Sequence, residues 1–176
     1  MTCIVALRAE GRVYMGADSA GVDSWSSIAR ADPKVFRNGR YLFGCTSSYR
    51  MIQILRHEKL ETVTGSHDSQ AYKLANQLQA LFVRQQFAKV EHGVAEGGSL
   101  LVAWDDVFYQ LDSDYQYARY REDYYSVGSG YMFALGALYA NASLTPRKRI
   151  RQALSAAVHN SGGVKPPFKI MATEAV

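Results

Sequence analysis

The first part of the chain has the polar and apolar pattern of two β-hairpins, in which short apolar or alternating segments flank turn residues. Glu10-Gly11 marks the first reversal, and Asn38-Gly39 marks the second with one of the strongest short-range hairpin signals. The strands expected beside these turns are residues 2–8, 13–18, 34–37 and 40–46.

Helical spacing follows the second hairpin. Met51, Ile52 and Leu55 recur at the interval of one helix face and predict a helix from 48 to about 60. A longer amphipathic helix is predicted over 69–89, where apolar residues continue at the same spacing. Residues 92–98 are expected to form a loop.

The rest of the chain repeats the order of strands followed by helices. Thr145 and Pro146 are a typical N-cap and first position for the last helix. Four antiparallel strands, two helices and a closing strand are predicted over 99–104, 107–112, 116–121, 124–127, 130–140, 146–160 and 169–173.

This order predicts an α+β fold, a four-layer αββα sandwich of two antiparallel sheets flanked by helix pairs. The chain has 176 residues and shows no linker, repeat or low-complexity segment, so residues 1–176 are expected to form a single domain.

Composition narrows the class of protein. The chain is 48% hydrophobic and 20% charged, as expected of a globular domain. Its two cysteines, Cys3 and Cys45, lie in apolar runs and are expected to be buried thiols in a reducing cytoplasm. No apolar run reaches the length of a membrane span, and the N-terminus lacks the pattern of a signal peptide.

The net charge of +4 leaves two interpretations of the basic segment 147–151 open. A nucleic-acid patch is one, and a solvated helix face, which we favour, is the other.

Tyrosines concentrate in the second half of the chain, either as strand formers or as a subunit contact. The four histidines have no metal-ligand spacing and no P-loop is present, so we expect neither a metal nor another cofactor.

Candidate chemistry concentrates at the N-terminus, where Thr2 is followed at equal spacings by Asp18 and Lys34. Removal of Met1 by a methionine aminopeptidase leaves Thr2 with a free α-amine beside its own hydroxyl. A hydroxyl needs a nearby base to become a nucleophile, and an α-amine has a pKa of about 7.7–8.0. Thr2 is therefore a candidate nucleophile and base in one residue, with Lys34 as its cation and Asp18 as the partner of that cation.

The same residues resemble the proteasome family, which includes β-type proteasome subunits and the smaller bacterial HslV-type peptidases, all N-terminal-nucleophile hydrolases. The similarity follows family order over most of the chain. Its segments are Thr2-Cys3-Ile4-Val5-Ala6-Leu7, Gly16-Ala17-Asp18-Ser19, Lys34-Val35-Phe36, Tyr41-Leu42-Phe43-Gly44-Cys45-Thr46-Ser47-Ser48, Ser126-Val127-Gly128-Ser129-Gly130 and Ser161-Gly162-Gly163.

The resemblance implies a threonine endopeptidase in which Thr2 attacks, Asp18 pairs with Lys34, and Lys34 polarises the Thr2 hydroxyl. Ser129 would relay the proton of the α-amine, and the backbone N–H of Ser48 would form the oxyanion hole. Supporting residues would be Ser161 and Gly162. Substrate-pocket positions inferred in the same way are Gly21, Thr46 and Arg50, with Arg50 favouring acidic side chains.

The sequence departs from the family pattern at two of these positions. Ser48 stands where the family usually has glycine, which adds a side chain at the cleft. Val158 stands where proteasome subunits usually carry an acid three residues before their Ser-Gly-Gly, which removes the usual support of Ser129.

Family members stack rings around an internal chamber, so the resemblance implies a homo-oligomeric double ring of six or seven subunits each. Its substrate would be a polypeptide, and a separate ATP-dependent unfoldase is a possible partner. Membrane and nucleic-acid partners are not expected. Two other functions remain open: a non-catalytic ring or scaffold subunit, and an amidohydrolase of the same fold acting on small amides.

Overall fold

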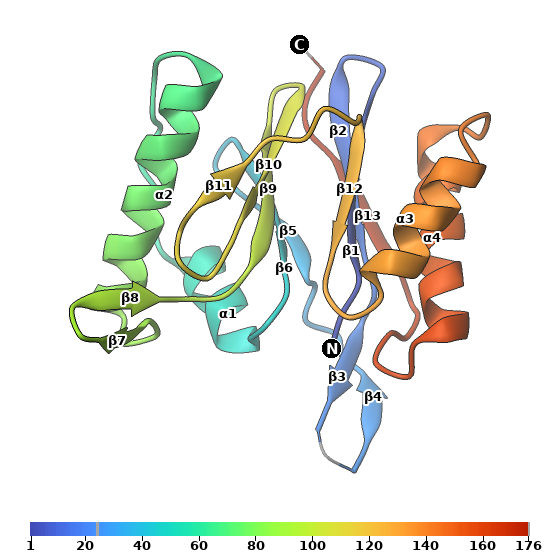
Figure 1. Cartoon of the computed structure of the whole chain (residues 1–176), viewed down its shortest axis with the longest axis horizontal. Coiled ribbons are helices and arrows are strands. Elements are labelled where there is room, and N and C mark those ends of the chain that lie inside the picture. Colours follow the sequence, from blue (N-terminus) through green and yellow to red (C-terminus); the bar gives the residue numbers. More distant parts are fainter. Residues whose placement is uncertain (24, 176) are drawn as a thin grey trace.

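The first predicted hairpin forms the centre of a four-stranded antiparallel sheet with strand order β12-β1-β2-β13 (Figure 1). The computed structural model describes residues 1–23 and 25–175. Glu10 and Gly11 have φ of 55° and 66°, the left-handed conformation that a two-residue hairpin turn requires. The strands are β1 (Ile4–Ala9), β2 (Arg12–Ala17), β12 (Tyr124–Val127) and β13 (Lys169–Ala172).

The second predicted hairpin, around Asn38-Gly39, lies in a five-stranded antiparallel sheet with strand order β11-β10-β9-β6-β5. Two of its three inner strands, β6 and β9, are buried along their whole length because layers cover both faces. The strands are β5 (Val35–Asn38), β6 (Tyr41–Cys45), β9 (Leu100–Trp104), β10 (Val107–Leu111) and β11 (Tyr117–Ala118).

Helix pairs cover the outer faces of the two sheets (Figure 1). Helices α1 (Tyr49–His57) and α2 (His67–Arg84) pack on the five-stranded sheet, and α3 (Tyr131–Ala140) and α4 (Pro146–Asn160) pack on the four-stranded sheet. Three apolar clusters fill the three interfaces between these layers. The predicted αββα sandwich is confirmed.

The contact between the two sheets depends on a missing side chain. A methyl group at Gly44 of β6 would lie 2.5 Å from Cγ2 of Ile4 and 2.6 Å from Sδ of Met15. Ile4 and Met15 belong to the two central strands of the other sheet. Glycine therefore allows these side chains to reach the backbone of β6, which sets the separation of the sheets.

The predicted ends of the long helix and of the loop after it are wrong. Helix α2 ends at Arg84 rather than near 89, because Gln86 takes a left-handed φ of 51° and Phe87 folds back. The Phe87 ring packs against Phe82 at 5.2 Å between centroids, so its burial reflects a return of the chain rather than another helical turn. The segment 92–98, expected to be a loop, contains the strand β8 (Val94–Glu96), which forms a hairpin with β7 (Lys89–Glu91).

Two further local features differ from the expectations. A short hairpin of β3 (Ala20–Val22) and β4 (Ser27–Ala29), which the sequence pattern did not indicate, follows Asp18. Thr145 is the N-cap residue of α4, but its side chain accepts no hydrogen bond from the helix, so the stabilisation expected of this cap is absent.

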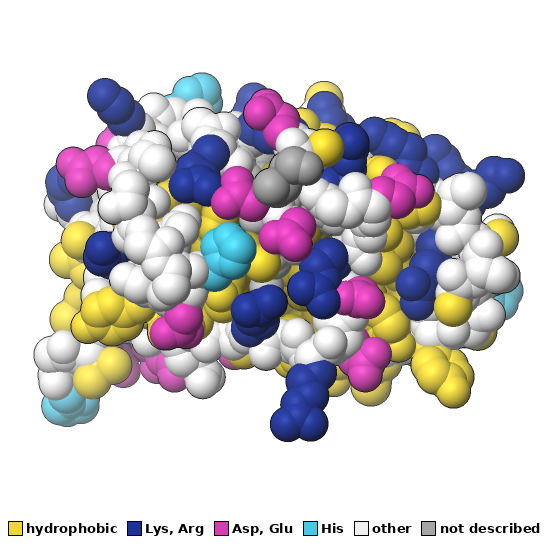
Figure 2. Space-filling model, turned by 90° about the horizontal axis from the view of Figure 1, so that it is seen from above, with side chains coloured by type: hydrophobic (Ala, Val, Ile, Leu, Met, Phe, Trp, Pro, Cys, Tyr) yellow, Lys and Arg dark blue, Asp and Glu magenta, His cyan; other side chains and the backbone are white. Residues whose placement is uncertain are grey.

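Positive and negative side chains are interspersed on the face seen in Figure 2. Arg8 pairs with Asp123 at 2.5 Å and Arg40 pairs with Asp105 at 2.6 Å, all four side chains being partly exposed. A mixture of both signs is typical of a solvated surface rather than of a continuous anion-binding patch.

Substitution of Gly44 by alanine is expected to lower the free energy of unfolding by about 1–3 kcal/mol, because the added methyl group overpacks the interface between the sheets. Urea denaturation followed by circular dichroism measures the change.

The matched control is Gly162→Ala, where an added methyl group meets nothing within 4 Å and φ is not positive. Its stability should stay within about 0.5 kcal/mol of the wild type. Equal stabilities of the Gly44→Ala variant and the wild type would contradict the close approach of the sheets.

Candidate active site

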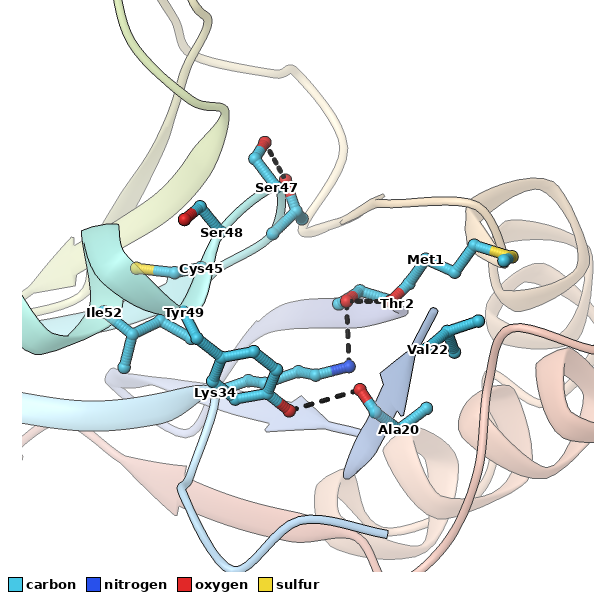
Figure 3. A pocket seen from close by; sticks show the side chains of 11 residues that line it. Met1, Thr2, Ala20, Val22, Lys34, Cys45, Ser47, Ser48, Tyr49 and Ile52 are labelled. Carbon is cyan, nitrogen blue, oxygen red and sulfur yellow. Dashed lines mark hydrogen bonds between the residues drawn. The ribbon is translucent and has the colours of Figure 1, made fainter. Parts of the chain in front are cut away.

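The Thr2 hydroxyl, the Lys34 ammonium and the Asp18 carboxylate meet where the two sheets come together (Figure 3 shows the first two). Thr2 precedes β1, Asp18 follows β2 and Lys34 precedes β5, so each lies at the end of a strand. Lys34 Nζ donates to Thr2 Oγ1 at 2.8 Å and to Asp18 Oδ1 at 2.9 Å. One cation therefore joins the candidate nucleophile to a buried acid.

Burial makes this ion pair unusual, since the side chains of Lys34 and Asp18 are 2% and 0% exposed. Loss of hydration lowers the pKa of Lys34 from its ordinary value, and the Asp18 carboxylate opposes that shift. Charged groups are tolerated in such a place only when they are paired and fully hydrogen-bonded.

Backbone amides complete the coordination of the Asp18 carboxylate. Its Oδ1 also accepts from the N–H of Cys3 at 3.0 Å, and its Oδ2 accepts from Ala20 at 2.8 Å and Lys165 at 3.2 Å. These donors come from the start of β1, from β3 and from the segment before β13, so the carboxylate is held by three separate parts of the chain.

Met1 is present, and the Thr2 nitrogen is part of a peptide bond. The Thr2 N–H donates to Ser129 Oγ at 3.2 Å, and the Thr2 hydroxyl donates to the Met1 carbonyl at 2.5 Å. A methyl group at Gly163 would lie 2.3 Å from Met1 Cβ, so this glycine makes room for Met1. The Thr2 nitrogen is therefore an amide here and not a free amine.

Ser48, the candidate oxyanion-hole residue, uses its backbone amide within its own loop. The N–H donates to the Thr46 carbonyl at 2.6 Å across a tight turn in which Ser47 has a left-handed φ of 59°. The Ser47 hydroxyl also accepts from the N–H of Ser99 at 3.2 Å, which ties this turn to the neighbouring strand. In this conformation the Ser48 amide does not point to a free site, and its hydroxyl caps α1.

A cavity of about 80 Å³ lies beside the Thr2 hydroxyl (Figure 3). Thr46, one of the predicted pocket residues, lies in its wall, and the sequence interpretation missed apolar residues of the lining that include Ala20, Val22, Tyr49 and Ile52. Tyr49 and Ile52 belong to α1, the helix that the sequence predicts after Ser48. Their position in the first turn of this helix, close to Thr46 in sequence, was the signal available for finding them.

Two of the other predicted pocket residues lie elsewhere. Arg50 is exposed on α1 and does not line this cavity. Gly21 lines an adjacent cavity together with Arg30, whose guanidinium stacks on the Tyr49 ring at 3.7 Å. Arg30 is thus the arginine next to this site, and it is paired with Asp32 at 2.6 Å.

The supporting residues are only partly where the resemblance placed them. Ser161 ends α4, and within the described residues its hydroxyl makes no hydrogen bond to Ser129 or Thr2. Gly162 is exposed with no neighbouring atoms within 4 Å of an added methyl group. Gly163, the next residue of the same motif, is the one that contacts the N-terminus.

Residues 1–23 and 25–175 contain no group of three His, Cys, Asp or Glu side chains arranged to hold a metal ion. None of the helices in these ranges has the length and hydropathy needed to cross a bilayer.

Comparison with known proteins places the chain in a fold class. No protein-family model matches the sequence, and no curated protein matches it significantly. The bacterial proteasome homologue BPH of Thiobacillus denitrificans in complex with epoxomicin superposes with a TM-score of 0.83 at 19% identity, covering 99% of each chain. A second BPH structure gives 0.82 at 19% identity, covering 99% of this chain and 98% of that one.

Eukaryotic HslV from Trypanosoma brucei has a TM-score of 0.69 at 18% identity, covering 98% of this chain and 99% of the HslV chain. The chain therefore has the proteasome-like fold of the N-terminal-nucleophile hydrolases. The resemblance to the proteasome and HslV family inferred from sequence motifs is confirmed in the fold.

The buried thiols beside the site predict a loss of stability in alkaline solution. Burial raises the pKa of Cys3 to about 12 and also raises that of Cys45, from an ordinary value of 9.0. Above about pH 9 the unfolded chain releases both protons while the folded chain keeps them, so the free energy of unfolding falls as the pH rises.

Between pH 8 and 10 the Cys45→Ala variant should lose about 1.4 kcal/mol less stability than the wild type, because it lacks one such thiol. Urea midpoints at both pH values measure the difference, and the variant's stability at pH 7 separates out the cost of its cavity. Equal losses for the two proteins would show that the Cys45 thiol ionises alike in the folded and unfolded chain.

Proposed function

We propose that this protein is a threonine endopeptidase subunit whose nucleophile is Thr2 after removal of Met1. The observation that carries the proposal is the contact of Lys34 Nζ with both Thr2 Oγ1 and the Asp18 carboxylate inside a buried ion pair. A cation held 2.8 Å from a hydroxyl stabilises its deprotonated form. The proteasome-like fold supports the same chemistry.

The proposed reaction begins when the free α-amine of Thr2 takes the proton of its own hydroxyl. Oγ1 then bonds to the peptide carbonyl carbon, and the C–N bond breaks as the leaving nitrogen takes the proton from the α-ammonium group. Water next attacks the ester and gives a proton to the α-amine, and the bond from the acyl carbon to Oγ1 breaks as Oγ1 takes that proton, which releases the acid product and free Thr2. Ser129, 3.2 Å from the Thr2 nitrogen, orients this amine.

The oxyanion formed in the first step needs a hydrogen-bond donor. We assign that role to the Ser48 amide once its bond to the Thr46 carbonyl is broken. The left-handed Ser47 makes the closed turn costly for a residue with a side chain, which favours opening when substrate offers a better acceptor.

The surface of α3 supports the proposed assembly of subunits. The helix is apolar on almost every side, and Met132 and Tyr139 are 63% and 78% exposed. A helix without a polar face is normally covered. We propose that other copies of the chain cover it in a double ring of six or seven subunits each.

The proposal also includes a cellular compartment and a partner for the enzyme. The free, buried Cys3 and Cys45 suit a reducing cytoplasm. A self-enclosed peptidase needs its substrates unfolded, and a separate ATP-dependent unfoldase would supply polypeptide to the rings.

A non-catalytic ring subunit is the second candidate function. The observation that favours it is the closed turn at Ser47, which occupies the Ser48 amide. Val158, in place of the acid usual in the family, favours the same candidate.

The test of the peptidase is intact mass before and after incubation with epoxomicin, the ligand in the BPH complex. Its epoxyketone needs a hydroxyl and a free α-amine on one residue, so the chain should lose Met1 and gain one adduct. Cleavage of casein should stop when the adduct forms.

Two variants serve as controls. Thr2→Ala should form no adduct and cleave nothing, because the hydroxyl is gone. Lys34→Met should react at least about 100-fold more slowly, since it keeps the length of the side chain but removes the cation. A processed wild-type chain with no adduct and no cleavage would favour the non-catalytic subunit.

The assembly is tested by Tyr139→Glu, which places a charge on the apolar face of α3. We expect the mass in light scattering to fall from that of an oligomer toward that of a 19.6 kDa monomer. Tyr72→Glu, at a comparably exposed tyrosine on α2, should keep the oligomer. A wild-type protein of monomer mass would refute the proposed ring.

A further inference from the structure

A second cavity, of about 340 Å³, adjoins the candidate nucleophile and has no role in the chemistry described above. Thr46 lines both this cavity and the smaller one beside Thr2. Gly128, also in its wall, lies against Thr2, because a methyl group there would be 2.3 Å from the Thr2 carbonyl oxygen. The cavity therefore begins at the backbone of the nucleophile.

The position of the α-amine decides which part of a substrate enters this cavity. In amide hydrolysis the leaving nitrogen must take the proton held by the base. The Thr2 nitrogen lies 3.2 Å from Ser129 Oγ, next to Gly128. The leaving group therefore departs on the Ser129 side, toward the second cavity, while the acyl part stays beside Lys34, Ala20 and Tyr49.

The lining of the second cavity contains one formal charge. Among its described lining residues, which include Ser99, Gln110 and Tyr131, only Asp112 is acidic or basic. Asp112 Oδ1 accepts from Gln110 Nε2 at 2.5 Å and from the Ser99 hydroxyl at 3.4 Å. Within the described residues no Lys, Arg or His lies within ion-pair distance of this carboxylate, and its Oδ2 accepts no hydrogen bond.

The orientation of Gln110 makes the carboxylate a fixed feature of the wall. The Tyr120 hydroxyl donates to Gln110 Oε1 at 2.5 Å, which directs the amide nitrogen of Gln110 to Asp112. The N-terminal end of α3 also borders the cavity at Tyr131. Its partial charge of about +0.5 is smaller than the full negative charge of Asp112, so a cation is still favoured.

Resting on the proposed function, we propose that this cavity binds the residue that follows the scissile bond and that Asp112 selects lysine or arginine there. The aliphatic stem of such a side chain would lie along Tyr125 and Tyr131, and its charged end would reach Asp112 Oδ2. A charge-assisted hydrogen bond in a half-buried site discriminates by about tenfold or more.

The test uses three internally quenched peptides that are identical except for Lys, Gln or Glu after the scissile bond, with the cut located by mass spectrometry. The processed wild type should cleave the Lys peptide with a kcat/KM about tenfold above that of the Gln peptide, and the Glu peptide least well. The Asp112→Asn variant should bring the Lys and Gln values together, and Asp112→Lys should reverse the order in favour of Glu.

Asp114→Asn is the matched control, because Asp114 lies on the same turn, is exposed and is not in the cavity wall. It should keep the wild-type order of the three peptides. Epoxomicin labelling of each variant verifies that its nucleophile is intact.

The possible failures are distinguishable. A wild type that takes up epoxomicin and cleaves all three peptides at equal rates would overturn the role of Asp112 and leave the peptidase standing. An Asp112→Asn variant that still prefers the Lys peptide would also overturn the role of Asp112 and leave the peptidase standing. A wild type that neither forms the adduct nor cleaves any peptide would refute the proposed function, and the inference with it.

Discussion

The buried pair of Lys34 and Asp18 is the interaction on which the geometry of the candidate site depends. Removing two charges from water costs several kcal/mol for each ion, and their attraction offsets this only when the remaining hydrogen-bonding groups are satisfied. Three backbone amides and the Thr2 hydroxyl satisfy them here. Since Asp18 and Lys34 adjoin different sheets and these groups come from segments far apart in sequence, the pair is stable only in the assembled sandwich.

The packing between the sheets determines whether the two charges can meet. Asp18 follows a strand of the four-stranded sheet, and Lys34 precedes a strand of the five-stranded sheet. Gly44 lets Ile4 and Met15 of one sheet reach the backbone of the other. Close packing of apolar side chains at this interface thus sets a distance of 2.9 Å between polar groups at its edge.

Two groups that the proposed chemistry needs are engaged within the structure. The Thr2 nitrogen is bonded to Met1, which packs on Gly163, and the Ser48 amide is bonded to the Thr46 carbonyl. Under the proposed function, the first contact withholds the base and the second withholds the oxyanion donor. Both are local and leave the contact of Lys34 with Thr2, and the cavities on either side of Thr2, in place.

The sequence by itself determined the features that depend on neighbouring residues, including both β-hairpins, whose turns have left-handed residues at Glu10-Gly11 and at Gly39. Motif resemblance also singled out Thr2, Asp18 and Lys34, which the structure brings together. It likewise singled out Arg50 and Gly162, which are exposed and do not line the cavity beside Thr2. The periodicity extended α2 through Phe87, because burial can arise from a returning chain as well as from a helix face. Only the tertiary structure decided which residues line the cavities, that the Ser48 amide is engaged and that Asp112 lies in the wall of the second cavity, since each depends on contacts between segments that are distant in sequence.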